Sequence, residues 1–73
     1  MENVDFLLRL TSRSDVSTAE VSEIFGISKK EALAKMQTMP SFQKWRGRFY
    51  ANAGDVKKVF QKEIDEYLDS VPF

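Results

Sequence analysis

Two helix-start signals on either side of one glycine constrain the fold of this chain more than any other feature. Ser17 is followed three positions later by Glu20, and Ser28 is followed three positions later by Glu31. Such a pair can form a capping box, in which each side chain accepts a hydrogen bond from the other residue's backbone N–H. Gly26 lies between the two pairs, where the end of a helix favours a left-handed residue. The pattern therefore predicts two short helices joined by a tight turn.

The two helices are expected over residues 18–25 and about 29–38. Their inner faces carry apolar side chains at helical spacing, namely Val21, Ile24 and Phe25 in the first helix and Ala32, Leu33, Met36 and Met39 in the second. Pro40 ends the second helix, because the residue before a proline is pushed out of helical geometry. A short turn with glycine is typical of the helix-turn-helix, in which the helices cross steeply. An ordinary corner of a small helical bundle fits the same residues, so both interpretations stay open.

Aromatic-rich runs on both sides of Gly47 predict a β-hairpin. Its register is open: a three-residue loop would place Trp45 opposite Phe49, with both in the core, whereas a two-residue loop would place Trp45 opposite Arg48. In either register two arginines, Arg46 and Arg48, lie at the tip. Stacking of Trp45 on a nucleic-acid base is possible, but packing in the core is the favoured interpretation. The strands are expected over residues 42–45 and 48–51.

One helix is expected before this central region and one after it. The first spans about 3–11, followed by a turn at 12–15, and its apolar side is formed by Val4, Phe6, Leu7, Leu8, Leu10 and Thr11. A second turn is expected at 52–54, with Asp55 as the N-cap of the last helix. That helix carries the strongest periodic signal in the chain, a continuous inner stripe of Val56, Val59, Phe60, Ile64, Tyr67, Leu68 and Val71.

The chain has zero net charge, but the charges are unevenly distributed. Residues 1–27 hold two basic and five acidic side chains, residues 28–62 hold nine basic and two acidic, and residues 63–73 hold four acidic and none that is basic. A strongly basic centre between acidic ends indicates a binding face for a polyanion more clearly than the total charge does.

Composition excludes several classes of protein. The chain has no cysteine and no histidine, so disulfides, the usual zinc sites and Ser–His or Cys–His catalysis are ruled out. The densest carboxylates, Asp65, Glu66 and Asp69, fit a solvated helix face. We therefore expect no enzyme, no metal and no cofactor. The N-terminal apolar run is too short for a signal peptide, and no segment could span a membrane. We expect a cytoplasmic protein that does not contact membranes.

The segment Val16-Ser-Thr-Ala-Glu-Val-Ser-Glu-Ile-Phe-Gly-Ile-Ser-Lys-Lys-Glu-Ala-Leu33 is similar to the two-helix core of the winged helix-turn-helix superfamily. Trp45-Arg-Gly-Arg-Phe-Tyr50 lies where that family carries its wing. The resemblance covers nearly the whole chain and extends to the compact excisionase and MerR-like modules of bacterial and phage regulators. Two features depart from the pattern. Ser22 stands where the family usually has a small apolar residue, and the inner positions of the second helix, where the family favours branched aliphatics, hold Ala32, Leu33 and Met36.

The resemblance implies one mainly α domain over residues 1–73, with the order helix, helix-turn-helix, two-stranded wing and C-terminal helix. It implies a non-enzymatic protein that binds double-stranded DNA in transcription regulation or recombination. The helix at 29–38 would enter the major groove, and the basic wing at 44–50 would lie on the adjacent backbone or minor groove. The expected DNA-binding residues are Ser17, Thr18, Ser28, Lys29, Lys30, Lys35, Gln37, Lys44, Arg46 and Arg48.

A second hypothesis is a winged-helix module that binds protein, as an adaptor, an inhibitor or a subunit of a complex. The acidic residues Glu63, Asp65, Glu66 and Asp69 could contact a basic partner or a second copy of the chain. One small domain also makes few phosphate contacts, so tight DNA binding would itself require a dimer or tandem sites.

Overall fold

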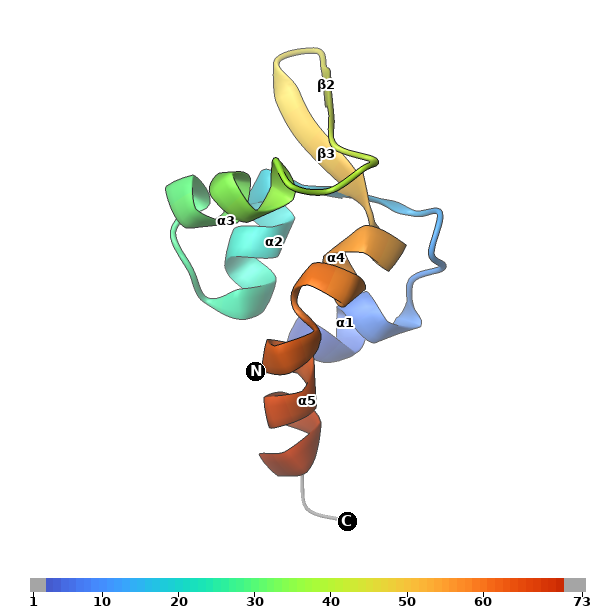
Figure 1. Cartoon of the computed structure of the whole chain (residues 1–73), viewed down its shortest axis with the longest axis vertical. Coiled ribbons are helices and arrows are strands. Elements are labelled where there is room, and N and C mark those ends of the chain that lie inside the picture. Colours follow the sequence, from blue (N-terminus) through green and yellow to red (C-terminus); the bar gives the residue numbers. More distant parts are fainter. Residues whose placement is uncertain (1–2, 71–73) are drawn as a thin grey trace.

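The computed structural model describes residues 3–70 and shows a mainly helical fold with a small antiparallel sheet (Figure 1). In chain order the elements are α1 (Asn3–Arg9), β1 (Asp15–Ser17), α2 (Thr18–Phe25), α3 (Lys29–Met36), β2 (Gln43–Trp45), β3 (Arg48–Asn52), α4 (Ala53–Val59) and α5 (Gln61–Ser70). The strands form one sheet in the order β1-β3-β2. Figure 1 shows the β2–β3 hairpin projecting from one end of the molecule and α5 from the other.

The predicted start and end of α2 are confirmed. The Ser17 hydroxyl accepts from the Glu20 N–H at 3.2 Å, and the Glu20 carboxylate accepts from the Ser17 N–H at 3.2 Å, so the capping box is complete. Gly26 ends the helix in the left-handed region, with φ of 63°. The Ser22 hydroxyl donates to the Ile27 carbonyl at 2.6 Å, which ties the turn back to the helix. A polar residue at position 22 therefore has a structural role in this chain.

The second predicted capping box is only half formed. The Ser28 hydroxyl accepts from the Glu31 N–H at 3.1 Å, but the return bond from Glu31 to the Ser28 backbone is absent from the described residues. Helix α3 ends at Met36, slightly before the predicted end. Ala32 and Met36 are buried as expected, whereas Leu33 is only half-buried.

The two serine caps are therefore expected to differ in their effect on stability. Ser17→Ala removes a reciprocal box and should lower the free energy of unfolding by about 1 kcal/mol. Ser28→Ala removes a single exposed bond and should cost less. Urea unfolding followed by circular dichroism compares the two variants directly. Equal losses would contradict the distinction between a complete and a half-formed box.

The hairpin adopts the two-residue loop. Trp45 pairs with Arg48, and the loop residues Arg46 and Gly47 have φ of 50° and 77°. Positive φ at both positions is the geometry of a type I′ turn, whose twist matches that of the flanking strands. In this register Trp45 lies outside the core with 59% of its surface exposed, so the favoured interpretation of this residue was wrong.

Strand β1 was not predicted. Residues 12–15 were expected to form a turn, but Asp15 already begins a strand that pairs with β3, placing Val16 opposite Ala51. Both of these side chains are fully buried. A strand of three residues is too short to show a period in the sequence, and its pairing partner lies more than thirty positions away.

The last predicted helix begins earlier than expected. Asn52, not Asp55, is the N-cap: its side-chain oxygen accepts from the Asp55 N–H at 2.9 Å. The residues expected to turn at 52–54 instead form the cap and first turn of α4. Asp55 is then the third residue of the helix, where its carboxylate is free to bond elsewhere.

The last helix is also not continuous. Phe60 has φ of −98° and ψ of 21°, which separates α4 from α5. Val56, Phe60 and Ile64 are buried as expected and Tyr67 is half-buried, but Val59 and Leu68 are exposed. The remaining member of the predicted stripe, Val71, lies outside the described residues.

The core lies where α1, α2, α3 and α4 meet the inner face of the sheet. Within the core Phe25 and Phe60 stack, with ring centroids 4.1 Å apart. Helix α1 is shorter than predicted and buries fewer side chains, because Phe6 and Leu8 are exposed. The buried residues are Val4, Leu7, Val16, Val21, Ile24, Phe25, Ala32, Met36, Met39, Ala51, Ala53, Val56, Phe60 and Ile64.

Candidate nucleic-acid interface

Three separate chain segments meet around one hollow of about 430 Å³, which we call the interface hollow. It is lined by the start of α2, the start of α3 and the end of the hairpin, through Ser17, Thr18, Ala19, Lys29, Gly47, Arg48 and Phe49. Four of the ten predicted DNA-binding residues are thus brought to one place: Ser17, Thr18, Lys29 and Arg48. Six others, Ser28, Lys30, Lys35, Gln37, Lys44 and Arg46, do not line it.

The start of α2 contributes polar atoms to the interface hollow. The Ser17 hydroxyl and the Glu20 carboxylate already bond each other's backbone, so the helix start is satisfied internally. The Thr18 hydroxyl oxygen is buried and has no hydrogen-bond partner among residues 3–70. A buried hydroxyl without a partner is costly to the fold.

The start of α3 presents two lysines to solvent. Lys29 and Lys30 are both exposed in the first turn, and neither has an acidic partner within the described part of the chain. Lys35 differs from the prediction: it is half-buried, and its Nζ lies 5.4 Å from the ring centroid of Phe60. Its cation therefore stacks on the core rather than pointing away from it. Gln37 is exposed and follows the end of the helix.

The hairpin adds a second group of cations. The Lys44 Nζ lies 5.5 Å from the ring centroid of Phe49, and the Arg46 guanidinium lies 4.4 Å from that of Trp45. Arg48 is exposed and has no acidic partner among the described residues. The hairpin carries no acidic residue. Its positive charge is therefore not neutralised locally.

A network of hydrogen bonds fixes the base of the hairpin to α4. The Ser41 hydroxyl donates to the Asp55 carboxylate and accepts from the Asn52 N–H at 2.9 Å. The Ser41 N–H donates to the same carboxylate oxygen at 2.9 Å. These bonds from Ser41, helped by the nearby charge of Lys58, hold the pKa of Asp55 below its ordinary value of 3.8. Sequence reasoning missed this network, because nothing at position 41 marks a partner fourteen residues later.

Asp55→Asn is expected to destabilise the fold at neutral pH but not in acid. A pKa that is lower in the folded chain means that ionised Asp55 stabilises the fold above its ordinary pKa, and that this contribution is lost as pH falls through the folded value. The urea midpoint of the wild type should therefore exceed that of Asp55→Asn at about pH 7, and this difference should shrink as the pH falls below about 4. Asp65→Asn, on the exposed side of α5, is the matched control. A gap that does not change with pH would contradict this role of Asp55.

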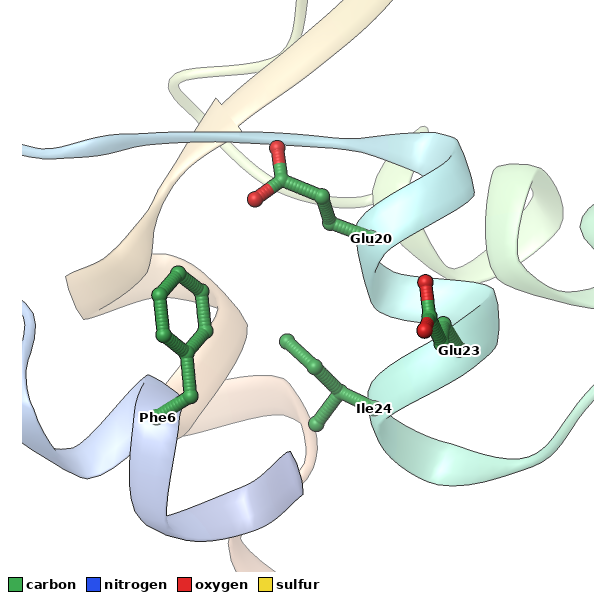
Figure 2. Close-up of a pocket in the computed structure, with 4 residues that line it drawn as sticks. All are labelled: Phe6, Glu20, Glu23 and Ile24. Carbon is green, nitrogen blue, oxygen red and sulfur yellow. The ribbon is translucent and has the colours of Figure 1, made fainter.

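A second hollow, of about 280 Å³, lies between α1 and α2 and has the opposite character. Figure 2 shows the side chains of Phe6 and Ile24 directed into the space between the two helices, with Glu20 and Glu23 along one side. Carboxylates repel phosphate groups, so this face does not suit a polyanion. The molecule therefore separates a basic hollow from an acidic one.

The basic residues of the last helices lie elsewhere. Lys57 donates from its Nζ to the Leu10 carbonyl at 2.9 Å, which fastens the end of α1 to α4. Lys62 is exposed on α5, the helix that projects from the end of the molecule opposite the hairpin (Figure 1). Within the described residues, no three His, Cys, Asp or Glu side chains are grouped to hold a metal ion. None of the helices in that part of the chain is long and apolar enough to cross a membrane.

Comparisons of the chain with protein-family models, with curated proteins and with solved structures found no match.

Proposed function

We propose that this protein binds double-stranded DNA as a small winged helix-turn-helix domain, and that it acts in transcription regulation or recombination without catalysing a reaction. In this proposal α3 enters the major groove and the β2–β3 hairpin is the wing, lying on the adjacent backbone or minor groove. The observation that carries the proposal is the interface hollow, where Thr18, Lys29 and Arg48 converge from three chain segments.

The dimensions of α3 support the proposal. An α-helix with its side chains is about 10–12 Å across, so α3 fits the major groove, which is about 12 Å wide. Ala32 and Met36 hold one face against the core, while Lys29 and Lys30 are exposed at the N-terminal end. The N-terminal residues of a recognition helix are those that meet base edges.

The charge distribution supports the same orientation. The hairpin and the start of α3 carry cations, whereas α5 projects from the opposite end with Glu63, Asp65, Glu66 and Asp69 (Figure 1). The acidic hollow between α1 and α2 would likewise be kept away from phosphates. A chain with zero net charge can thus have one face that attracts a duplex and other faces that do not.

The direct test is a titration of labelled protein with a blunt random duplex at low salt, following backbone amide shifts. We expect shifts in residues 17–18, 28–38 and 44–50 that shrink as salt rises, because phosphate binding releases counterions. Residues of α5 serve as an internal reference within the same spectra. Shifts without a common face, or none at all, would contradict the proposal.

One observation favours the alternative of a protein-binding module. The acidic hollow places Phe6, which is 50% exposed, beside Glu20 and Glu23, a combination suited to a basic segment with an apolar side chain. Under this alternative, Phe6→Ser would abolish partner binding. Under the proposed function, the same variant would bind the duplex as the wild type does.

A further inference from the structure

The sheet has an outer face that takes no part in the core. In an antiparallel sheet, directly paired residues share a face and side chains alternate along each strand. Val16 pairs with Ala51 and both are buried, so their face points to the helices. Gln43 pairs with Tyr50, and these two residues belong to the opposite set. This opposite set also contains Ser17, Arg48 and Asn52. We call its four members that line one hollow, namely Asp15, Gln43, Trp45 and Tyr50, the outer sheet face.

The outer sheet face is hollowed and unusually aromatic. Its four residues line a hollow of about 370 Å³, separate from the interface hollow. Trp45 is the most exposed of the large apolar side chains in the described part of the chain, at 59%. Trp45 and Tyr50 are diagonal neighbours across β2 and β3, a relation that places side chains roughly 7–8 Å apart. Both rings thus border one hollow on the same face of the sheet.

We propose that the outer sheet face stacks an unpaired nucleobase, so that the protein prefers a duplex that continues into unpaired nucleotides. Base–aromatic stacking is the common basis of single-strand binding, and every base offers a flat face to Trp45 and Tyr50. The Asp15 carboxylate and the Gln43 amide lie at the same hollow and suit the polar edge of a base. The proposal rests on the proposed function, which places the hairpin on the duplex.

The charges of the hairpin favour a nucleic acid over a cationic ligand at this face. A carboxylate beside two aromatic rings would also suit an ammonium group. However, Arg46 and Arg48 lie beside Trp45 on a hairpin without acidic residues. The Arg46 guanidinium already lies over the Trp45 ring, and it can turn from the indole to a phosphate or a base. A polyanion with flat bases therefore satisfies more of this surface than a cation does.

Trp45 is the only tryptophan in the chain, so its fluorescence reports on the outer sheet face directly. We would titrate the protein with a blunt duplex, with the same duplex carrying a short single-stranded overhang, and with the overhang strand alone. We expect strong quenching with the overhang duplex and with the single strand, and little with the blunt duplex. Labelled-DNA anisotropy should show at least fivefold tighter binding of the overhang duplex than of the blunt one.

Variants separate this inference from the proposed function. Trp45→Ala should bind both duplexes alike, because without the indole the overhang gains no stacking contact. Phe6→Ala, which removes an exposed aromatic ring from α1, should keep the preference. Equal binding of the two duplexes by the wild type, or a preference that survives in Trp45→Ala, would overturn the inference.

Two further outcomes are decisive. Quenching by choline at concentrations where the single strand has no effect would identify a cation site and overturn the stacking inference. Failure to bind the blunt duplex, together with quenching by the single strand, would contradict the proposed function while supporting the stacking site.

Discussion

Replacing Phe60 with alanine is expected to leave the chain largely unfolded. The Phe60 side chain is 1% exposed, and its ring stacks on that of Phe25. It also lies at the junction of α4 and α5, so both helices lose their anchor with it. Removing a buried phenylalanine costs about 3–5 kcal/mol. That loss is comparable with the whole stability of a marginal domain of this size, which has no disulfide to compensate.

Circular dichroism and urea unfolding measure this effect. The matched control is Phe6→Ala, which removes the same atoms from a side chain that is 50% exposed on α1. Its midpoint should stay close to that of the wild type, because surface substitutions cost about 0.5 kcal/mol or less. A Phe60→Ala protein with a wild-type midpoint would show that the Phe25–Phe60 stack contributes little to the stability of the core.

The starts of α2 and α3 and the end of α2 could be predicted because the residues that set them act locally. The serine caps at positions 17 and 28 and the left-handed Gly26 act within a few residues of where they stand, and each was found at its expected position. The inner face of α2 followed from helical spacing for the same reason. Capping and periodicity reflect the backbone's own hydrogen bonds, which do not depend on distant parts of the chain.

The features that escaped prediction depend on contacts between distant segments. Strand β1 exists because Val16 pairs with Ala51, and Asn52 caps α4 while Ser41 occupies the Asp55 carboxylate. The break at Phe60 could not be predicted from the sequence, because buried residues continue at four-residue spacing on both sides of it. Such arrangements are decided by tertiary packing, which sequence patterns describe poorly.

The same distinction applies to the candidate interface. The basic character of residues 28–62 is visible in the sequence, but which cations face one ligand depends on the hairpin register and on the crossing of α2 and α3. Lys35 illustrates this dependence: helical spacing predicts that its side chain points outward, yet its Nζ lies over the Phe60 ring. Trp45 shows the converse, since a residue expected in the core is displayed on the outer sheet face.

The double variant Arg46→Ala/Arg48→Ala is expected to cause the largest loss of duplex binding. Both arginines are exposed on the hairpin, and Arg48 also lines the interface hollow. If each neutralises one phosphate, the slope of log affinity against log salt should become shallower by about 1.8. With equal binding of the two proteins in 1 M salt, this change corresponds to about 60-fold weaker binding at 0.1 M.

The control for this hairpin variant is Arg13→Ala/Lys62→Ala, which removes two exposed positive charges that lie outside the hairpin and the interface hollow. It produces the same change in net charge, so general attraction to DNA falls equally in both double variants. Anisotropy titrations over a range of salt concentrations separate the slope from the affinity. A shallower slope in the hairpin variant alone would assign two phosphate contacts to the hairpin. Equal slopes in the two double variants would mean that the hairpin attracts DNA only through net charge, and the wing would then be removed from the binding mechanism.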